Sequence, residues 1–346
     1  MSLTENNVRK ALAEVLLPGT ETKLLDTSML EGLKIEGDKL SLTLKLPAAD
    51  INKEALRQSL DAALGKVPGL ARFQISWAFA KKMPPPLLAG VRHILLVGAG
   101  KGGVGKSTIA VNLAYALAAE GAKVGLLDAD FYGPSLPLMS GVKEPPYSKD
   151  GKTMEPLEAH GVRMISIGFL VEPNQALVWR GPMLHAALSQ LMRDVNWGSL
   201  DWMVVDLPPG TGDVVLSIAQ HVHASGAILV STPQKVALAD VIRARQMFAS
   251  IQVPVLGMVE NMSRFICPCC GTETPIFDAG GARAAAKQMD IPFLGEIPMD
   301  MKIRQGGDTG LPLVLGHPES PEAKQFRAIA RQLALSVKER NLESPH

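Results

Sequence analysis

A glycine-rich segment in the first half of the chain has the residue types that hold phosphate groups. It fits the pattern G-x-x-x-x-G-K-[S/T], with an apolar run at 93–98 before it and an apolar helical pattern after it. Glycines allow backbone N–H groups to turn inward around phosphate oxygens, and the start of the following helix adds partial positive charge. We therefore predict a phosphate-binding loop, or P-loop, that binds ATP through Gly100, Lys101, Gly102, Gly103, Val104, Gly105, Lys106, Ser107 and Thr108.

Aspartates end two apolar runs farther along the chain. Asp128 and Asp130 follow one run, and Asp206 ends another. A carboxylate at the carboxyl end of a buried strand, beside a P-loop, can hold the water shell of Mg²⁺. Asp206 fits this role, with Ser107 as a direct Mg²⁺ ligand and Lys106 as the lysine that reaches the β- and γ-phosphates. For each aspartate the alternative is a cap of a helix or a turn.

All three cysteines lie in one tetrapeptide, Cys267-Pro268-Cys269-Cys270. This clustering excludes a disulfide scaffold and indicates metal or redox chemistry. A thioredoxin-like pair needs a helix behind its first cysteine, and Gly271 and Pro275 disfavour one. Zinc and iron–sulfur sites need more ligands than Cys267 and Cys270 of one chain provide. Two copies about a twofold axis would supply four sulfurs, and the residues alone leave zinc and iron–sulfur open.

Composition excludes several classes of protein. Hydrophobic residues make up 47% of the 346 residues and charged residues 20%, as in a folded globular chain. The net charge of +1 predicts no affinity for nucleic acid or for an anionic membrane. The first residues lack a signal-peptide pattern, and no apolar run reaches the roughly 18 residues of a membrane span. We therefore expect a cytoplasmic protein.

The chain divides into two predicted domains. Residues 1–83 form a small α+β domain, and residues 84–91 form a stiff linker because consecutive prolines disfavour a helix. The periodicity of residues 1–83 predicts a helix at 7–16, a strand at 39–45, a helix at 53–64 and a strand at 71–77.

Residues 92–346 are predicted to form an α/β domain with a mostly parallel sheet. Helical segments alternate with short apolar runs, of the kind that parallel sheets bury on both faces, at 93–98, 123–128, 162–167, 202–206, 227–231, 255–259 and 293–297. Helices should therefore cover both faces of the sheet, and ligands should bind beyond the carboxyl ends of the strands.

The P-loop carries a second lysine, Lys101, directly after its first glycine. The stretch GKGGVGKS at 100–107 resembles the deviant Walker A motif of the MinD, ParA and nitrogenase iron protein group, SIMIBI-type P-loop NTPases that dimerise face to face. This resemblance implies that Lys101 reaches the nucleotide of the partner subunit, that Asp128 supports the metal and that Asp130 orients the attacking water. It also implies that Asn261 contacts adenine, although an asparagine bonded to its own backbone is the alternative.

A longer stretch resembles a more specific family. N-M-S-x-F-x-C-P-x-C-G at 261–271, with DLPPGTGD at 206–213 and STPQ at 231–234, is similar to the Mrp/ApbC family of iron–sulfur cluster carrier ATPases. The resemblance implies a slow ATP hydrolase whose homodimer holds a cluster, usually [4Fe–4S], on Cys267 and Cys270. Apo iron–sulfur proteins would receive this cluster, and scaffold proteins would supply it.

Two points stay open at this stage. Cys269 departs from the family's pattern, in which that position is commonly not a cysteine. A zinc-stapled dimeric ATPase of the ParA/MinD type, acting as a positioning or assembly module, is the alternative function, because thiolates suit zinc as well as iron. The domain at 1–83 fits the family's small N-terminal domain and contains no cysteine.

Overall fold

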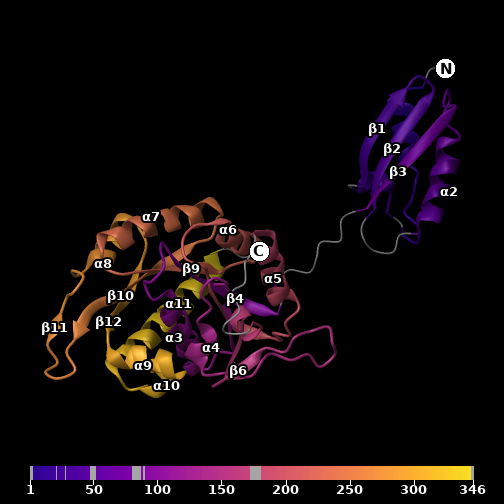
Figure 1. The fold of residues 1–346 in the computed structure, drawn as a ribbon. Helices are drawn as coiled ribbons and strands as arrows, with labels where there is room; N and C mark the ends of the chain where they lie inside the picture. The colour runs from indigo at the N-terminus through magenta and orange to yellow at the C-terminus, as the bar shows by residue number, and fades with distance from the viewer. Residues whose placement is uncertain are drawn as a thin grey trace. The chain divides into compact units, whose positions relative to one another are not determined.

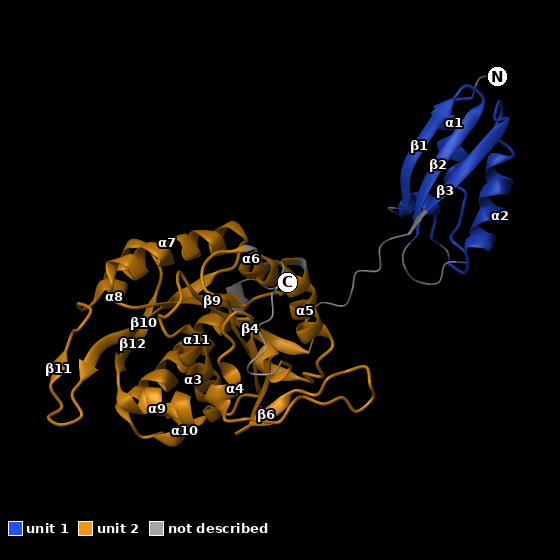
Figure 2. Cartoon of the chain, viewed as in Figure 1, with its two compact units in different colours: residues 1–84 blue, residues 85–346 orange. Residues whose placement is uncertain are grey.

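The computed structural model describes residues 3–20, 22–27, 29–46, 52–79, 87–88, 90–171 and 181–343. The chain divides into two compact units, residues 1–84 and residues 85–346 (Figure 2). The prolines on which the predicted linker at 84–91 depends lie outside the described residues. Val91, the last residue of that predicted linker, already belongs to the first strand of the second unit.

The first unit is an α+β unit, as predicted, and its sheet has three strands instead of the two expected. Its strands β1 and β2 are antiparallel and its strands β2 and β3 are parallel. Alternate leucines of β2 are buried beside both helices in one apolar core. The elements are α1 (Glu5–Leu12), β1 (Leu30–Glu36), β2 (Lys39–Leu46), α2 (Lys53–Leu64) and β3 (Arg72–Phe79).

One expectation for this unit was wrong, and one strand was missed. The first helix ends at Leu12 rather than at residue 16, because Leu16 leaves the helix and forms a backbone bridge with Lys23. The strand β1 was not predicted. Its pairing with β2 shifts between Leu30 and Gly32, and this irregularity breaks the simple alternation of apolar and polar residues.

The second unit is built on a nine-stranded sheet, in the order β11-β10-β9-β4-β8-β5-β7-β6, with β12 also paired to β10. Every predicted apolar run is a strand, and these strands are parallel to their neighbours among them. The strands β6 and β11 are short antiparallel additions that sequence analysis did not predict. The strands are β4 (Val91–Ala99), β5 (Val124–Asp128), β6 (Leu157–Ala159), β7 (Val162–Ser166), β8 (Leu200–Asp206), β9 (Gly226–Ser231), β10 (Val255–Ile266), β11 (Glu273–Thr274) and β12 (Phe293–Met299).

Helices cover both faces of this sheet, which confirms the predicted layers (Figure 1). Leu95 and Val97 of β4 face a core shared with α3 and α11, whereas Ile94 and Leu96 face a core shared with α5, α6, α7 and α8. The helices are α3 (Lys106–Ala119), α4 (Leu136–Ser140), α5 (Gly181–Arg193), α6 (Asp213–His221), α7 (Lys235–Ser250), α8 (Gly281–Gln288), α9 (Met301–Thr309), α10 (Leu313–Gly316) and α11 (Pro321–Glu343).

Candidate functional site

The predicted P-loop connects the carboxyl end of β4 to the start of α3. Two of its glycines leave no room for a side chain. A Cβ on Gly100 would lie 2.3 Å from the backbone carbonyl carbon of Asp240 in α7. Gly105 has a φ of +80°, and a Cβ there would lie 2.1 Å from the side-chain nitrogen of Asn261. The loop is therefore held between α7 and β10, with its N–H groups beside the start of α3.

The strands bring the predicted aspartates together. Asp128 of β5 is opposite Asp206 of β8, and Asp206 is opposite Val97 of β4, just before the P-loop. Because these strands are parallel, their carboxyl ends share one edge of the sheet. The structure thus joins residues that are far apart in the sequence into one site.

Lys106 forms a buried ion pair with Asp206. Its Nζ lies 2.6 Å from Oδ1 of Asp206 and 3.8 Å from Oδ2 of Asp130. It also lies 3.4 Å from the hydroxyl oxygen of Ser107. Burial raises the pKa of Asp206 above its usual value, and the lysine charge opposes this change. Lys106 therefore compensates the carboxylate at the position where phosphate charge would enter.

Asp128 is fully enclosed and accepts three hydrogen bonds from the protein. The donors are the backbone N–H of Asp130 at 3.0 Å, that of Leu136 at 3.3 Å and the hydroxyl of Ser166 at 2.9 Å. Burial, together with the charge of Asp206, raises its pKa to about 7. Both carboxylate oxygens thus organise the segment between β5 and α4. Ser166, at the end of β7, was not predicted to belong to this site.

The oxygen donors beside Lys106 fit Mg²⁺. Oδ1 of Asp130 is buried and has no hydrogen-bond partner among the described residues. The hydroxyl of Ser107 and the carboxylate of Asp206 both contact the ammonium group of Lys106. Mg²⁺ prefers carboxylate, hydroxyl and water oxygens, so this donor set has the chemistry that the ion requires.

Asn261 lies inside β10 and not after it, because this strand continues to Ile266 instead of ending at Val259. Its side-chain nitrogen donates a hydrogen bond of 2.9 Å to the backbone carbonyl of Val104 in the P-loop. The side chain of Asn261 therefore forms its hydrogen bond with the P-loop and not with its own backbone. It also lines a largely apolar cavity of about 570 Å³, together with Thr108 and the turn at 298–300.

The structure gives Lys101 a position at the rim of the P-loop. Its side chain is half-buried and forms no ion pair or hydrogen bond with the residues that the structure describes.

The cysteines occupy the hairpin that joins β10 to β11. The N–H of Cys267 donates to the carbonyl of Thr272 at 3.0 Å, and the N–H of Gly271 donates to the carbonyl of Cys267 at 2.9 Å. Sγ of Cys270 lies 3.2 Å from the hydroxyl of Thr272. This contact is the largest cause of a lowered pKa of Cys270, to which backbone N–H groups and Cys267 add. The turn thus stabilises a thiolate, the form that binds soft metals.

The two ends of the C-x-x-C pair differ in exposure. Cys267 is half-buried, whereas Cys269 and Cys270 are exposed. In the described ranges, no group of three or more His, Cys, Asp or Glu side chains is arranged to hold a metal ion.

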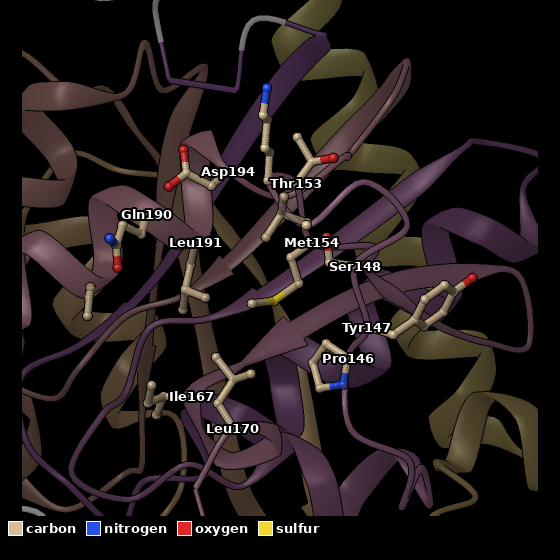
Figure 3. Close-up of a pocket in the computed structure, with 14 residues that line it drawn as sticks. Pro146, Tyr147, Ser148, Thr153, Met154, Ile167, Leu170, Gln190, Leu191 and Asp194 are labelled. Atoms are coloured by element: carbon tan, nitrogen blue, oxygen red, sulfur yellow. The ribbon is translucent and has the colours of Figure 1, made fainter.

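A second cavity, of about 390 Å³, lies between α5 and the segment at 146–154 (Figure 3). Its apolar part includes Met154, Ile167 and Leu191, and its polar part includes Thr153 and Asp194. None of the residues predicted to do chemistry lines this cavity. We therefore place the candidate site at the P-loop and the cysteine hairpin.

Sequence models of two known families match the chain. One, described as iron-sulfur cluster assembly protein, matches residues 5–77, and the other, described as NUBPL iron-transfer P-loop NTPase, matches residues 90–334. The chain belongs to the NUBPL iron-transfer P-loop NTPase family. This membership confirms the P-loop NTPase fold and the predicted likeness to iron–sulfur cluster carriers.

Curated relatives in this family have names that describe cluster transfer. A *Deinococcus radiodurans* protein named iron-sulfur cluster carrier protein is 48% identical and aligns over 96% of this chain and 95% of its own. An *Escherichia coli* protein of the same name is 46% identical over 81% of this chain and 77% of its own. A *Dictyostelium discoideum* protein named iron-sulfur cluster transfer protein NUBPL is 48% identical over 71% of this chain and 77% of its own.

Solved structures confirm the fold of the second unit. A nucleotide-binding protein from *Archaeoglobus fulgidus*, solved with ADP, is 37% identical with a TM-score of 0.60 and covers 69% of this chain and 93% of that chain. The cell-division ATPase MinD from *Pyrococcus furiosus* is 25% identical with a TM-score of 0.52, covering 70% of this chain and 99% of its own. Among the described residues, no helix has both the length and the apolar character needed to cross a membrane.

Replacing Asn261 tests whether its side chain stabilises the P-loop or contacts the adenine base. If it stabilises the P-loop, the Asn261→Ala protein loses one neutral hydrogen bond. This loss should weaken nucleotide binding by roughly 1 kcal/mol, or about fivefold. We expect the affinities for ATP and GTP to fall by the same factor in isothermal titration, while Asn196→Ala, at an exposed position, changes neither. A loss confined to ATP would instead assign Asn261 to adenine recognition.

The buried Asp128 predicts a pH-dependent stability of the nucleotide-free protein. Its pKa is 3.8 when exposed and about 7 in the fold, so the folded state binds the extra proton. This contribution to stability is complete below pH ~4 and disappears as the pH rises through ~7. In urea unfolding at a series of pH values, Asp128→Asn should lack the part of the decline between pH 4 and 7 that the wild type shows. Parallel curves for the two proteins would show that Asp128 is ionised throughout.

Proposed function

We propose that this chain binds and hydrolyses ATP and carries an iron–sulfur cluster, as cargo, to apo-proteins. The observation that carries this proposal is the course of β10, which holds the P-loop at Asn261 and leads directly into the hairpin of Cys267 and Cys270. The names of the curated relatives support the cargo, and the family supports the nucleotide.

The P-loop residues 100–108 would hold the phosphates of ATP. Lys106 would neutralise the β- and γ-phosphates, while Ser107, Asp206 and Asp130 would hold Mg²⁺ or its water shell. Bound Mg²⁺ would supply charge neutralisation of the phosphates during phosphoryl transfer. Asp130 has a buried oxygen without a partner among the described residues, which suits it to orient a water molecule, and Asp128 would keep its segment in position.

Lys101 is proposed to act across a homodimer. Its side chain has no partner among the described residues of its own chain, and it lies on the P-loop. A cation that enters the partner's phosphate site could stabilise the charge that develops on the transferred phosphoryl group, as arginine fingers do. Dimerisation would thus become a condition for hydrolysis.

The same dimer would complete the cluster site. Each hairpin offers the thiols of Cys267 and Cys270, so two copies about a twofold axis offer four. The proposed cargo is a [4Fe–4S] cluster, supplied by scaffold proteins and received by apo iron–sulfur proteins. Exposure of Cys270 supports this site, because the hairpin of a second copy can reach its thiol.

We further propose a division of labour between domains. Residues 1–83 would form a separate domain for docking of clients or of the ATPase domain, joined by residues 84–91 to the ATPase domain at 92–346. Residues 1–83 contain no cysteine, so any thiolate ligand must come from the second domain. We also propose that the protein acts in the cytoplasm. The net charge of +1 supports a protein that binds neither nucleic acid nor an anionic membrane.

Reconstitution with iron and sulfide under anaerobic conditions tests the cargo. We expect the wild type to gain the visible absorbance of an iron–sulfur cluster, and Cys267→Ala or Cys270→Ala to gain little, because each removes two ligands from a dimer site. Cys269→Ala is the matched control, since its thiol lies outside the C-x-x-C pair, and it should gain the same absorbance as the wild type. A colourless wild type that retains zinc would favour the zinc-stapled alternative.

Lys101→Ala tests the role in trans. We expect ATP to bind with nearly unchanged affinity, because Lys106 remains, whereas kcat of ATP hydrolysis falls by about 10³-fold. Mixing Lys101→Ala with a variant that keeps Lys101 but cannot bind ATP should restore part of the activity. In a mixed dimer, the ATP bound to the Lys101→Ala subunit faces the intact Lys101 of the other subunit. Turnover at the wild-type rate in Lys101→Ala homodimers would remove this role.

A further inference from the structure

Arg264 ties the cysteine hairpin to the neighbouring strand. It lies in β10, three positions before Cys267. Its Nε lies 2.8 Å from a carboxylate oxygen of Glu273, in β11, and its NH1 donates to Glu296, in β12. One guanidinium group thus connects three strands at the base of the hairpin.

The backbone ladder is interrupted at the same place. The pairing of β10 with β12 shifts between Asn261 and Phe265, and Met262 has a φ of +56°. Beyond this irregularity, β11 is paired with β10 only at Phe265 and Ile266 in the described chain. Few backbone hydrogen bonds therefore fix the hairpin, and the side chain of Arg264 bridges the interruption.

The charges around Arg264 make this bridge hard to replace. The side chain of Arg264 is 31% exposed, and those of Glu273 and Glu296 are 56% and 37% exposed. Although burial acts against it, the hydrogen bond with Glu296 and the charges of Glu296 and Glu273 raise the pKa of Arg264. Without it, the carboxylates of Glu273 and Glu296, on the two strands that pair with β10, would lose their shared cation.

We propose that Arg264 is a positioning residue that fixes the orientation of the Cys267–Cys270 hairpin. Its consequence for cargo rests on the function proposed above, because four thiolates from two hairpins must meet around one cluster. A hairpin held in advance loses less conformational entropy when the cluster binds, and it holds the cluster longer. The spacing of the cysteines specifies the ligands, and Arg264 specifies where they are held.

Amide hydrogen exchange of the full-length, metal-free protein tests the positioning itself. We expect Arg264→Gln to raise exchange in residues 265–274 by about three- to tenfold, and Arg264→Lys by less, because lysine keeps the charge without the planar fork. The matched control is Arg331→Gln, which removes an arginine bound to Glu120 through two hydrogen bonds on α11. It should leave exchange in residues 265–274 unchanged.

Cluster retention in the reconstituted dimer tests the consequence. After addition of an iron chelator, the visible absorbance of Arg264→Gln should decay several-fold faster than that of the wild type or of Arg331→Gln. Glu273→Gln should give an intermediate rate, since Glu296 remains bound to Arg264.

The two proposals can fail separately. Unchanged exchange at 265–274 in both Arg264 variants would overturn the positioning role whether or not a cluster forms. A wild type that forms no cluster, together with raised exchange in Arg264→Gln, would overturn the proposed cargo and keep the positioning role. Equal decay rates with raised exchange would overturn the link between hairpin order and retention.

Discussion

The burial of unlike charges at one edge of a parallel sheet is the constraint on which the site depends. Lys106, Asp128 and Asp206 lie within the apolar core, where an unpaired charge would be costly. The fold tolerates them because Lys106 and Asp206 neutralise each other and because Asp128 accepts hydrogen bonds from its surroundings. The hydrogen-bonding capacity of these groups is only partly used, since Asp130 retains a buried oxygen without a partner among the described residues. The described residues thus leave this oxygen available to a further hydrogen-bond donor or to a cation.

The strand β10 links this hard-ligand site to the soft-ligand hairpin. At about 3.3 Å per residue, the stretch from Asn261 to Cys267 spans roughly 20 Å. Asn261 holds the P-loop at one end, and Arg264 holds the strand to β11 and β12 before the cysteines begin. A shift of the P-loop would therefore displace β10, which continues into the hairpin. The irregular pairing around Met262 is where this strand can change its course with the smallest loss of backbone hydrogen bonds.

Sequence analysis predicted the central sheet because burial on both faces leaves a continuous apolar run, and it predicted the P-loop because the close approach of backbones requires glycine there. It could not predict the end of β10, since residues 261–266 are neither a continuous apolar run nor a regular alternation. It also missed Ser166 and Arg264. Their partners, Asp128 and Glu296, are 38 and 32 positions away, and only tertiary structure brings them together. Local patterns thus predicted the elements and the ligands, whereas the contacts that orient those ligands arise from the packing of distant strands.

The two sites differ in a way that separates their ligands chemically. The site around Lys106 offers buried carboxylate oxygens, which suit a small, hard cation, and an ammonium group, which suits phosphate. The hairpin offers sulfur at the edge of the sheet, with Cys270 exposed and its pKa lowered by Thr272. Soft metals prefer thiolates, and Mg²⁺ does not, so the two kinds of ligand do not compete even though one strand serves both.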